Sequence, residues 1–171
     1  MKKNNVLKLE VVKNLSKKEK VEVSKINFEN LAKNGGQLHF AGILAHHYVV
    51  LAKLNNVVVG YALLYQEFLY KNDLYVMQVA VDKRFQHCGI GSKMYEYAYK
   101  YSKGYSYLTS NVNPKNINSQ KFHEKMGFRS YGINQYGLIY IKPVKKEINE
   151  TFKDAKPICF KLKGKDEEKT L

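Results

Sequence analysis

The stretch of sequence that decides the fold runs from Leu74 to Tyr97 and reads LYVMQVAVDKRFQHCGIGSKMYEY. Its first part, Leu74–Val81, is an apolar run typical of a strand buried on both faces. A loop containing the residues QHCGIG (Gln86–Gly91) follows, and apolar residues then recur at helical spacing, which predicts a helix from Ile90 to about Lys103. A helix N-terminus leaves backbone N–H groups unpaired, and glycines let such amides approach an anion closely. The stretch is therefore a strand–loop–helix unit that can hold a phosphate.

The glycines of this loop do not establish a phosphate site by themselves. No Gly-Lys-Ser/Thr follows at the spacing of a Walker loop, and the pattern is not Gly-x-Gly-x-x-Gly either. An ordinary turn before a helix explains a single Gly-x-Gly equally well, so the rest of the chain has to decide.

The residues before this unit predict three strands and two helices. Ser16-Lys17-Lys18-Glu19 fits a capping box, in which serine and glutamate satisfy each other's backbone amides at a helix start. Asn55-Asn56 separates two apolar runs and tolerates positive φ, which predicts a β-hairpin. The expected elements are a strand at Val6–Val12, a helix from the capping box to about Lys33 that Gly35-Gly36 stops, a short helix at Gln37–His46, and strands at His47–Leu54 and Val57–Leu69.

The residues after the unit predict a further strand, a helix and two late strands. The strand is expected at Tyr105–Val112, the helix from about Asn116 to Met126, and the late strands at Leu138–Lys142 and Pro157–Leu162. Strand–helix–strand–helix following hairpins predicts an α/β (α+β) fold with a mixed sheet.

Length and composition fit one globular domain over residues 1–171, with frayed ends at 1–5 and 163–171. A hydrophobic content of 44%, with 14 Tyr and 8 Phe, excludes a disordered or fibrous chain. Cys88 and Cys159 cannot form a disulfide framework, and no Cys-x-x-Cys spacing predicts a metal site. No stretch reads as a membrane span or as the apolar core of a signal peptide, so a soluble, cytoplasmic protein is expected.

The chain is strongly basic, since 29 Lys and Arg against 15 Asp and Glu give +14. Such a charge attracts polyanions, among them nucleic acids and phosphorylated cofactors. All but two of the basic residues (Arg84 and Arg129) are lysines spread along the chain, and no aromatic–basic motif accompanies them. Lysine-rich solvated faces explain the charge more simply than a nucleic-acid partner, which stays open but is not favoured.

Two motifs together show a resemblance to a known family. QHCGIG resembles the acyl-CoA-binding motif of the GNAT superfamily of N-acyltransferases, Q/R-x-x-G-x-G/A. Downstream, NINSQKFHEKMGF (Asn116–Phe128) resembles that superfamily's second signature, N-x-x-A-x-x-F/L-Y-x-K-x-G-F. The motifs begin 30 residues apart (116 − 86 = 30), and the expected order of elements from Val6 to Leu162 is also similar to the family's.

The resemblance implies a fold, a co-substrate and a binding site. The fold is a mixed, mostly antiparallel sheet of about seven strands flanked by about four helices, and the co-substrate is acetyl-CoA without a metal. The strand before the loop would pair its backbone with the pantetheine arm, and the loop amides would hold the pyrophosphate. The matching positions are Val79, Ala80 and Val81 in the strand, Gln86, His87, Cys88, Gly89, Ile90, Gly91 and Ser92 in the loop and helix start, and Asn116 and Ser119 downstream. Plain core packing also accounts for the valine side chains, and a helix N-cap accounts for Asn116.

The implied chemistry is direct transfer of an acetyl group from a thioester to a primary amine. The family's acidic tyrosine matches His123, which could protonate the leaving thiolate as a histidinium or could simply pack beside the cofactor. Tyr131 or Tyr136 could replace it. The candidates for a general base are Glu67, Asp73 and the pair His46-His47, each weak, and a water chain could serve instead.

Three functions follow in order of preference. The first is an N-acetyltransferase acting on an amine of a small molecule or a protein, with acetyl-CoA and the amine as partners. The second is a CoA-binding or basic interaction module that kept the fold but lost turnover, and the third is a protein associated with nucleic acid or the ribosome. The +14 charge disfavours polyamine acceptors, because it would repel them. Family members often dimerise, so a homodimer is open.

Overall fold

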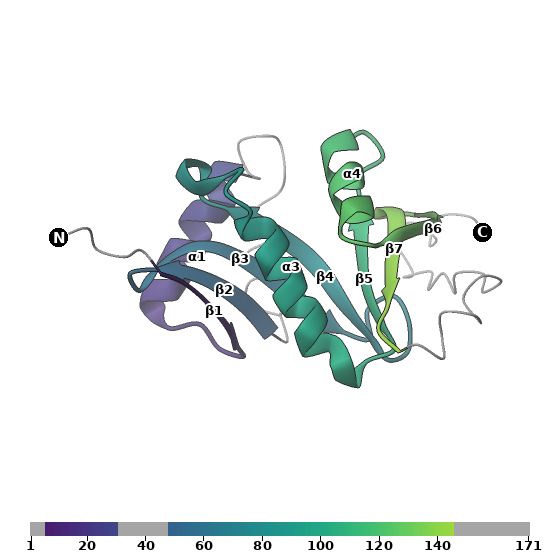
Figure 1. Cartoon of the computed structure of the whole chain (residues 1–171), viewed down its shortest axis with the longest axis horizontal. Coiled ribbons are helices and arrows are strands. Elements are labelled where there is room, and N and C mark those ends of the chain that lie inside the picture. The colour runs from purple at the N-terminus through teal and green to yellow at the C-terminus, as the bar shows by residue number, and fades with distance from the viewer. Residues whose placement is uncertain (1–5, 31–47, 146–171) are drawn as a thin grey trace, which may run out of the picture.

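The computed structural model describes residues 6–30 and 48–145 and has a single sheet of seven strands in the order β1-β2-β3-β4-β5-β7-β6 (Figure 1). All neighbouring strands run antiparallel except β4 and β5, which are parallel. The strands are β1 (Leu7–Val12), β2 (Tyr48–Leu54), β3 (Val57–Gln66), β4 (Asp73–Val81), β5 (Tyr107–Val112), β6 (Arg129–Asn134) and β7 (Gly137–Pro143). The expected mixed, mostly antiparallel sheet is confirmed.

Two helices cover opposite faces of this sheet. Helix α1 (Lys17–Asn30) and helix α3 (Ile90–Tyr101) each pack on the strands β2, β3 and β4, and the side chains of these strands alternate between them. In β2, Val49 and Leu51 lie in the core under α1, while Val50 and Ala52 lie in the core under α3. This period of two explains why the hairpin strands read as almost continuous apolar runs.

The remaining described helical elements are one 3₁₀ turn before α3, one after it, and a short helix later in the chain. They are the 3₁₀ turns η2 (Lys83–Phe85) and η3 (Ser102–Gly104) and the helix α4 (Ile117–Lys125) beside β5 and β7. Asn116 caps α4 by accepting a hydrogen bond from the Ser119 amide at 3.0 Å.

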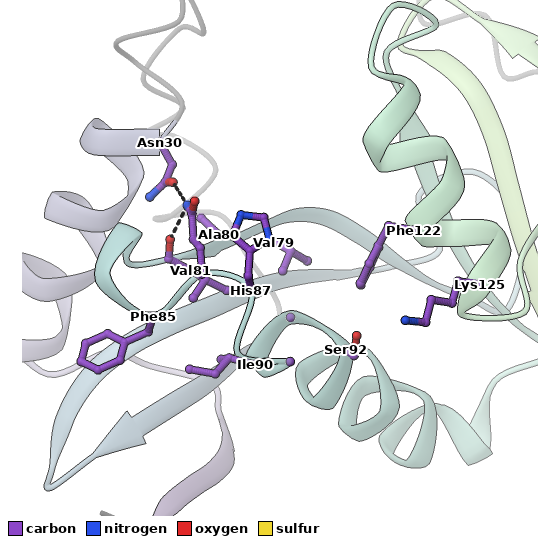
Figure 2. A pocket seen from close by; sticks show the side chains of 13 residues that line it. Asn30, Val79, Ala80, Val81, Phe85, His87, Ile90, Ser92, Phe122 and Lys125 are labelled. Atoms are coloured by element: carbon purple, nitrogen blue, oxygen red, sulfur yellow. Dashed lines mark hydrogen bonds between the residues drawn. The ribbon is translucent and has the colours of Figure 1, made fainter.

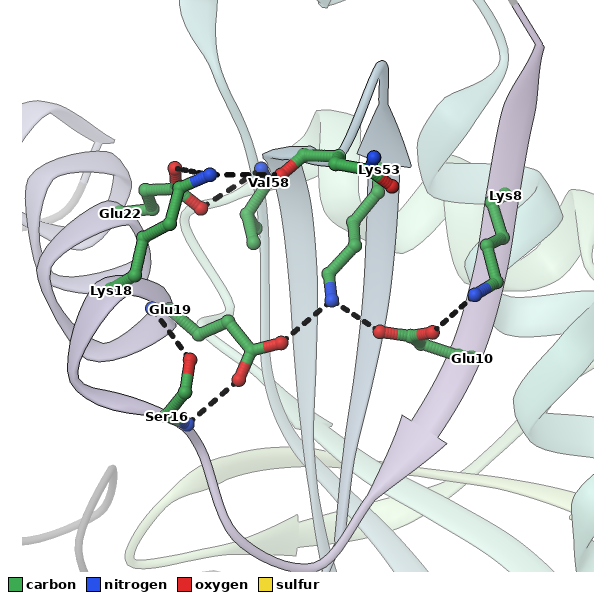
Figure 3. A network of polar contacts seen from close by, with 9 residues as sticks. Lys8, Glu10, Ser16, Lys18, Glu19, Glu22, Lys53 and Val58 are labelled. Atoms are coloured by element: carbon green, nitrogen blue, oxygen red, sulfur yellow. Dashed lines mark hydrogen bonds and ion pairs between the residues drawn. The ribbon is translucent and has the colours of Figure 1, made fainter.

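The N-terminus of α1 is fixed by the predicted capping box and by a group of charges around it (Figure 3). The Ser16 amide donates to Glu19 Oε2 at 2.7 Å, and the Glu19 amide donates to Ser16 Oγ at 3.3 Å. Lys53 on β2 donates to Glu19 at 2.6 Å and also pairs with Glu10 on β1. The hydrogen bond from Lys53, helped by those from Ser16, lowers the pKa of Glu19 to about 2. One lysine therefore joins the helix start to the edge of the sheet.

Strands β4 and β5 part halfway along, and this opening positions the site. They pair only from Asp73 with Tyr107 to Val76 with Ser110, so the rest of β4 has no partner on its β5 side among the described residues. A β-bulge lies at the same place, because Leu63 and Leu64 of β3 face Gln78 and Val76, which leaves Met77 as the extra residue. The strand was expected to be buried on both faces, but only Asp73–Val76 and Ala80 are buried, because β5 turns away from the rest.

Most other expectations are confirmed within a few residues. Asn55 and Asn56 form the hairpin turn with φ of 51° and 63°, and α3 ends at Tyr101, two residues earlier than expected. The edge strand β6 was missed, because its residues are largely exposed and Gly132 interrupts the pattern. Three α-helices are described where about four were expected. The expected helix at 37–46 and strand at 157–162 lie outside the described residues.

Candidate active site

A cleft of about 570 Å³ lies where the unpaired half of β4 meets the start of α3 (Figure 2). The strand supplies one wall, the loop after it the next, and α4 closes the far side. The residues that line it are Asn30, Val79, Ala80, Val81, Phe85, Gln86, His87, Gly89, Ile90, Gly91, Ser92, Phe122 and Lys125. Nine of the predicted binding residues are thus brought together, and no carboxylate is among the lining side chains.

The N-terminus of α3 opens into this cleft with free backbone amides. The first intrahelical hydrogen bond runs from the Lys93 amide to the Gly89 carbonyl, so the amides of Ile90, Gly91 and Ser92 have no helical acceptor. Gly89 is the N-cap at φ 77°, a left-handed conformation that glycine adopts without strain, and no side chain caps the helix. These amides and the helix dipole favour an anion at this point.

The strand wall offers backbone groups of its own. The Asp82 amide bonds to the Val59 carbonyl on the β3 side, so by alternation Val79 and Val81 direct their backbone groups to the open β5 side. The carbonyl of Val81 accepts from Gln86 Nε2 at 3.1 Å. The N–H and C=O of Val79 and the N–H of Val81 are therefore available to an extended ligand.

The side chain of Gln86 fastens the loop at the wall of the cleft. Its Nε2 donates to the Val81 carbonyl at the end of β4 and to Asn30 Oδ1 at the end of α1, at 2.6 Å (Figure 2). The side chain thus connects three elements around the cleft, and its backbone takes part in the turn that presents the α3 amides.

The sequence reasoning missed two side chains that close the cleft from α4. The ring of Phe122 stands opposite Gly91, where an added Cβ would lie 4.0 Å from Phe122 Cζ. Lys125 places a cation in the same cleft. Both belong to the second motif, so helical spacing from Asn116 was the signal that could have found them.

Comparison with known proteins now decides the family. The model of the acetyltransferase (GNAT) family matches residues 12–128, more than half of the chain. The chain belongs to the GNAT family. Among curated proteins, none matches it.

Solved structures share the GNAT fold at low sequence identity. A protein from Pyrococcus horikoshii OT3 is 22% identical with a TM-score of 0.68, and the match covers 81% of this chain and 98% of that one. A GNAT acetyltransferase from Staphylococcus aureus Mu50 is 17% identical with a TM-score of 0.63, covering 81% and 100%. The ribosomal-protein-S18-alanine N-acetyltransferase of Escherichia coli is 16% identical with a TM-score of 0.58, covering 81% and 95%.

Three predicted binding residues of this GNAT protein lie beside the cleft rather than in its lining. The exposed Cys88 points its thiol toward the Gln86 carbonyl at 3.5 Å. Asn116 is exposed and caps α4, and Ser119 is half-buried one turn before His123. Their roles toward a ligand stay predictions.

His123 is buried on the inner face of α4, with 4% of its surface exposed. Its Nδ1 lies 2.8 Å from the Ser119 carbonyl and its Nε2 lies 2.8 Å from the Tyr95 hydroxyl. A carbonyl can only accept, so we assign the proton to Nδ1, and Tyr95 donates to Nε2. Burial lowers the pKa of His123, which favours the neutral ring.

Two of the candidates for a general base, Glu67 and Asp73, lie away from the lining. Glu67 is exposed in the β3–β4 turn at φ 50°, where it accepts from the Asn72 amide at 3.1 Å. Asp73 is fully buried and accepts from Thr109 and from two amides of the same turn, and burial raises its pKa. The pair at 46–47 lies outside the described residues.

The alternative acids are also apart from the cleft. Tyr131 packs with the cluster of side chains around Tyr70 and Tyr75, on the face of β4 and β5 opposite α3. The ring centroid of the exposed Tyr136 lies 5.8 Å from that of Phe68, which packs against the same cluster.

The described residues contain no group of three or more His, Cys, Asp or Glu side chains that could hold a metal ion. Within residues 6–30 and 48–145, no helix is long and apolar enough to cross a membrane.

Proposed function

We propose that this GNAT protein is an acetyl-CoA-dependent N-acetyltransferase that transfers the acetyl group directly to a primary amine. The observation that carries the proposal is the union, in one cleft, of free helix amides with an unpaired strand edge. The amides suit a pyrophosphate and the edge suits the two amide groups of a pantetheine arm, which would add to β4 like a short strand.

The charge of the cleft supports an anionic ligand. The helix dipole and Lys125 supply positive potential, and no lining carboxylate opposes it. The net charge of +14 would add long-range attraction for a co-substrate with several phosphates.

The chemistry places three demands on the chain. The amine must lose a proton, the carbonyl oxygen must meet a hydrogen-bond donor as charge builds on it, and the sulfur must leave. The extra residue of the bulge at Met77 lies one position after the last β4–β5 pair, so its backbone is a candidate donor. A water path is the candidate base, because the carboxylates considered are engaged in the β3–β4 turn.

The test has two stages. Thermal melting with and without acetyl-CoA reports binding, and release of the CoA thiol in the presence of a panel of amines reports turnover. A rise in melting temperature together with amine-dependent thiol release supports an N-acetyltransferase. A rise without release from any amine would favour the alternative of a CoA-binding module, and no rise in a folded protein would reject both.

A further inference from the structure

The hydroxyl of Tyr95 lies at the point where β4 and β5 part. Besides contacting His123, it lies close to Ser110, whose Oγ donates to the Val76 carbonyl at 3.0 Å. Val76 and Ser110 form the last β4–β5 pair, so the phenol lies at the apex of the opening. Val79, which lines the cleft, lies three residues further along β4, about 10 Å away at the usual rise of a strand.

The surroundings hold this hydroxyl in one place. Tyr95 is 5% exposed, and the rings of Phe122, His123 and Phe128 pack edge-on around it, with centroids 5.1, 5.3 and 5.7 Å away. Phe122 also lines the cleft, so the cleft comes within one ring of the phenol. An acyl arm that follows β4 inward from the α3 amides ends at this apex.

His123 has nothing to give to a leaving group in this arrangement. Its Nδ1 proton is bound to the Ser119 carbonyl, and its Nε2 is an acceptor that Tyr95 already fills. A neutral imidazole whose two nitrogens are both hydrogen-bonded can influence the chemistry at the apex only by positioning the Tyr95 hydroxyl.

We propose that Tyr95 is the hydrogen-bond donor to the departing sulfur and that His123 is a positioning residue that holds the phenol at the apex. The inference deepens the proposed function and rests on it. The second motif suggested His123 on α4 as the donor to the leaving thiolate, and the inference assigns this role to a tyrosine on α3 instead.

The step balances without a further reactant. The amine nitrogen bonds to the carbonyl carbon, the carbon–sulfur bond breaks, and its electron pair goes to sulfur. As charge grows there, the Tyr95 O–H turns from the neutral Nε2 to the sulfur, because hydrogen bonds to a charged acceptor are roughly twice as strong as neutral ones. The amine proton passes to water, from which the departing thiolate takes up a proton. Tyr95 keeps its own proton. Its hydrogen bond to the sulfur forms fully only when negative charge has built up there, so this bond stabilises the transition state more than the bound substrate.

The experiment uses hydroxylamine as a small amine that needs no acceptor pocket. Release of the CoA thiol from acetyl-CoA is followed for the full chain and for Tyr95→Phe, His123→Leu and His123→Gln. Tyr99→Phe is the matched control, because it removes a tyrosine hydroxyl from the same helix. That hydroxyl donates to the Pro143 carbonyl at 3.3 Å. Acetyl-CoA binding and melting temperature are measured for every variant.

We expect Tyr95→Phe to lower kcat about 100-fold, as the loss of a transition-state donor does, with KM for acetyl-CoA within about twofold. His123→Leu should lower kcat about 10-fold, His123→Gln should recover part of it by offering an acceptor oxygen, and the double variant with Tyr95→Phe should be no slower than Tyr95→Phe alone. Tyr99→Phe should match the wild type.

Two results would overturn the inference while acetyl-CoA still binds and the wild type turns over. One is a Tyr95→Phe variant that melts normally and keeps its kcat. The other is a His123→Gln variant slower than Tyr95→Phe, which would return the role to the histidine itself. Failure of the proposed function is distinct, since acetyl-CoA would then leave the melting temperature of the wild type unchanged, or would raise it while no amine releases the CoA thiol faster than buffer does.

Discussion

Gly91→Leu should strongly weaken acetyl-CoA binding without unfolding the protein. Gly91 has ordinary helical geometry in the first turn of α3, and an added Cβ would meet only Phe122 Cζ, at 4.0 Å. The first carbon is therefore accommodated, and the remaining carbons of leucine must occupy the cleft between Gly91 and Phe122. Leucine is the better helix former by about 0.5–1 kcal/mol, so stability should hold or rise.

The size of the effect follows from linkage. At a ligand concentration of about 100 times Kd, binding adds about 2.7 kcal/mol to the free energy of unfolding. For a domain of this size, that raises the melting temperature by roughly 5–10 °C. A 100-fold weaker site in the variant would leave about 0.4 kcal/mol and a rise of roughly 1 °C.

Differential scanning fluorimetry with and without acetyl-CoA measures both numbers. Gly104→Leu is the matched control, because Gly104 lies just beyond the other end of α3 and an added Cβ would meet no atom within 4 Å. It should keep the full rise. A Gly91→Leu protein that also keeps the full rise would refute the placement of the pyrophosphate at the α3 N-terminus.

Three further predictions test the charges and contacts around the site and the core. Lys125→Ala should weaken acetyl-CoA binding about 3–10-fold, and the loss should shrink at high salt, whereas Lys121→Ala on the exposed face of α4 should not change the affinity measured by calorimetry. Gln86→Ala should weaken binding with little effect on melting temperature, because it releases the loop from β4 and α1 while its backbone amides remain. The pKa of Glu19, about 2, lies below the unfolded value of 4.5, so Glu19 stabilises the fold above about pH 4.5. This contribution of about 1–3 kcal/mol to the free energy of unfolding is lost as the pH falls toward 2. Urea unfolding at pH 6 and pH 3 should show the loss, and Glu19→Gln should remove most of this contribution.

The sequence determined the local parts of this protein. Alternating and continuous apolar runs predicted β2, β3 and β4, the spacing of α3 predicted an amphipathic helix, and the pair Ser16 and Glu19 predicted the capping box of α1. Each of these signals depends on residues within one turn or one strand, so it can be read without knowing the fold. The glycines at 89 and 91 likewise placed the free amides at the start of α3.

Only the tertiary structure decided how these parts make a site. The parting of β4 from β5 after Val76 depends on pairing between strands far apart in the chain, and it leaves the second half of β4 with an open edge among the described residues. The edge strand β6 gave no period-2 signal, because one bonded neighbour supports it and most of its side chains face solvent. Helical spacing put His123 on the inner face, but its partner Tyr95 comes from another helix 28 residues earlier. A contact of that kind is fixed by packing between elements, and no local pattern in the sequence encodes it.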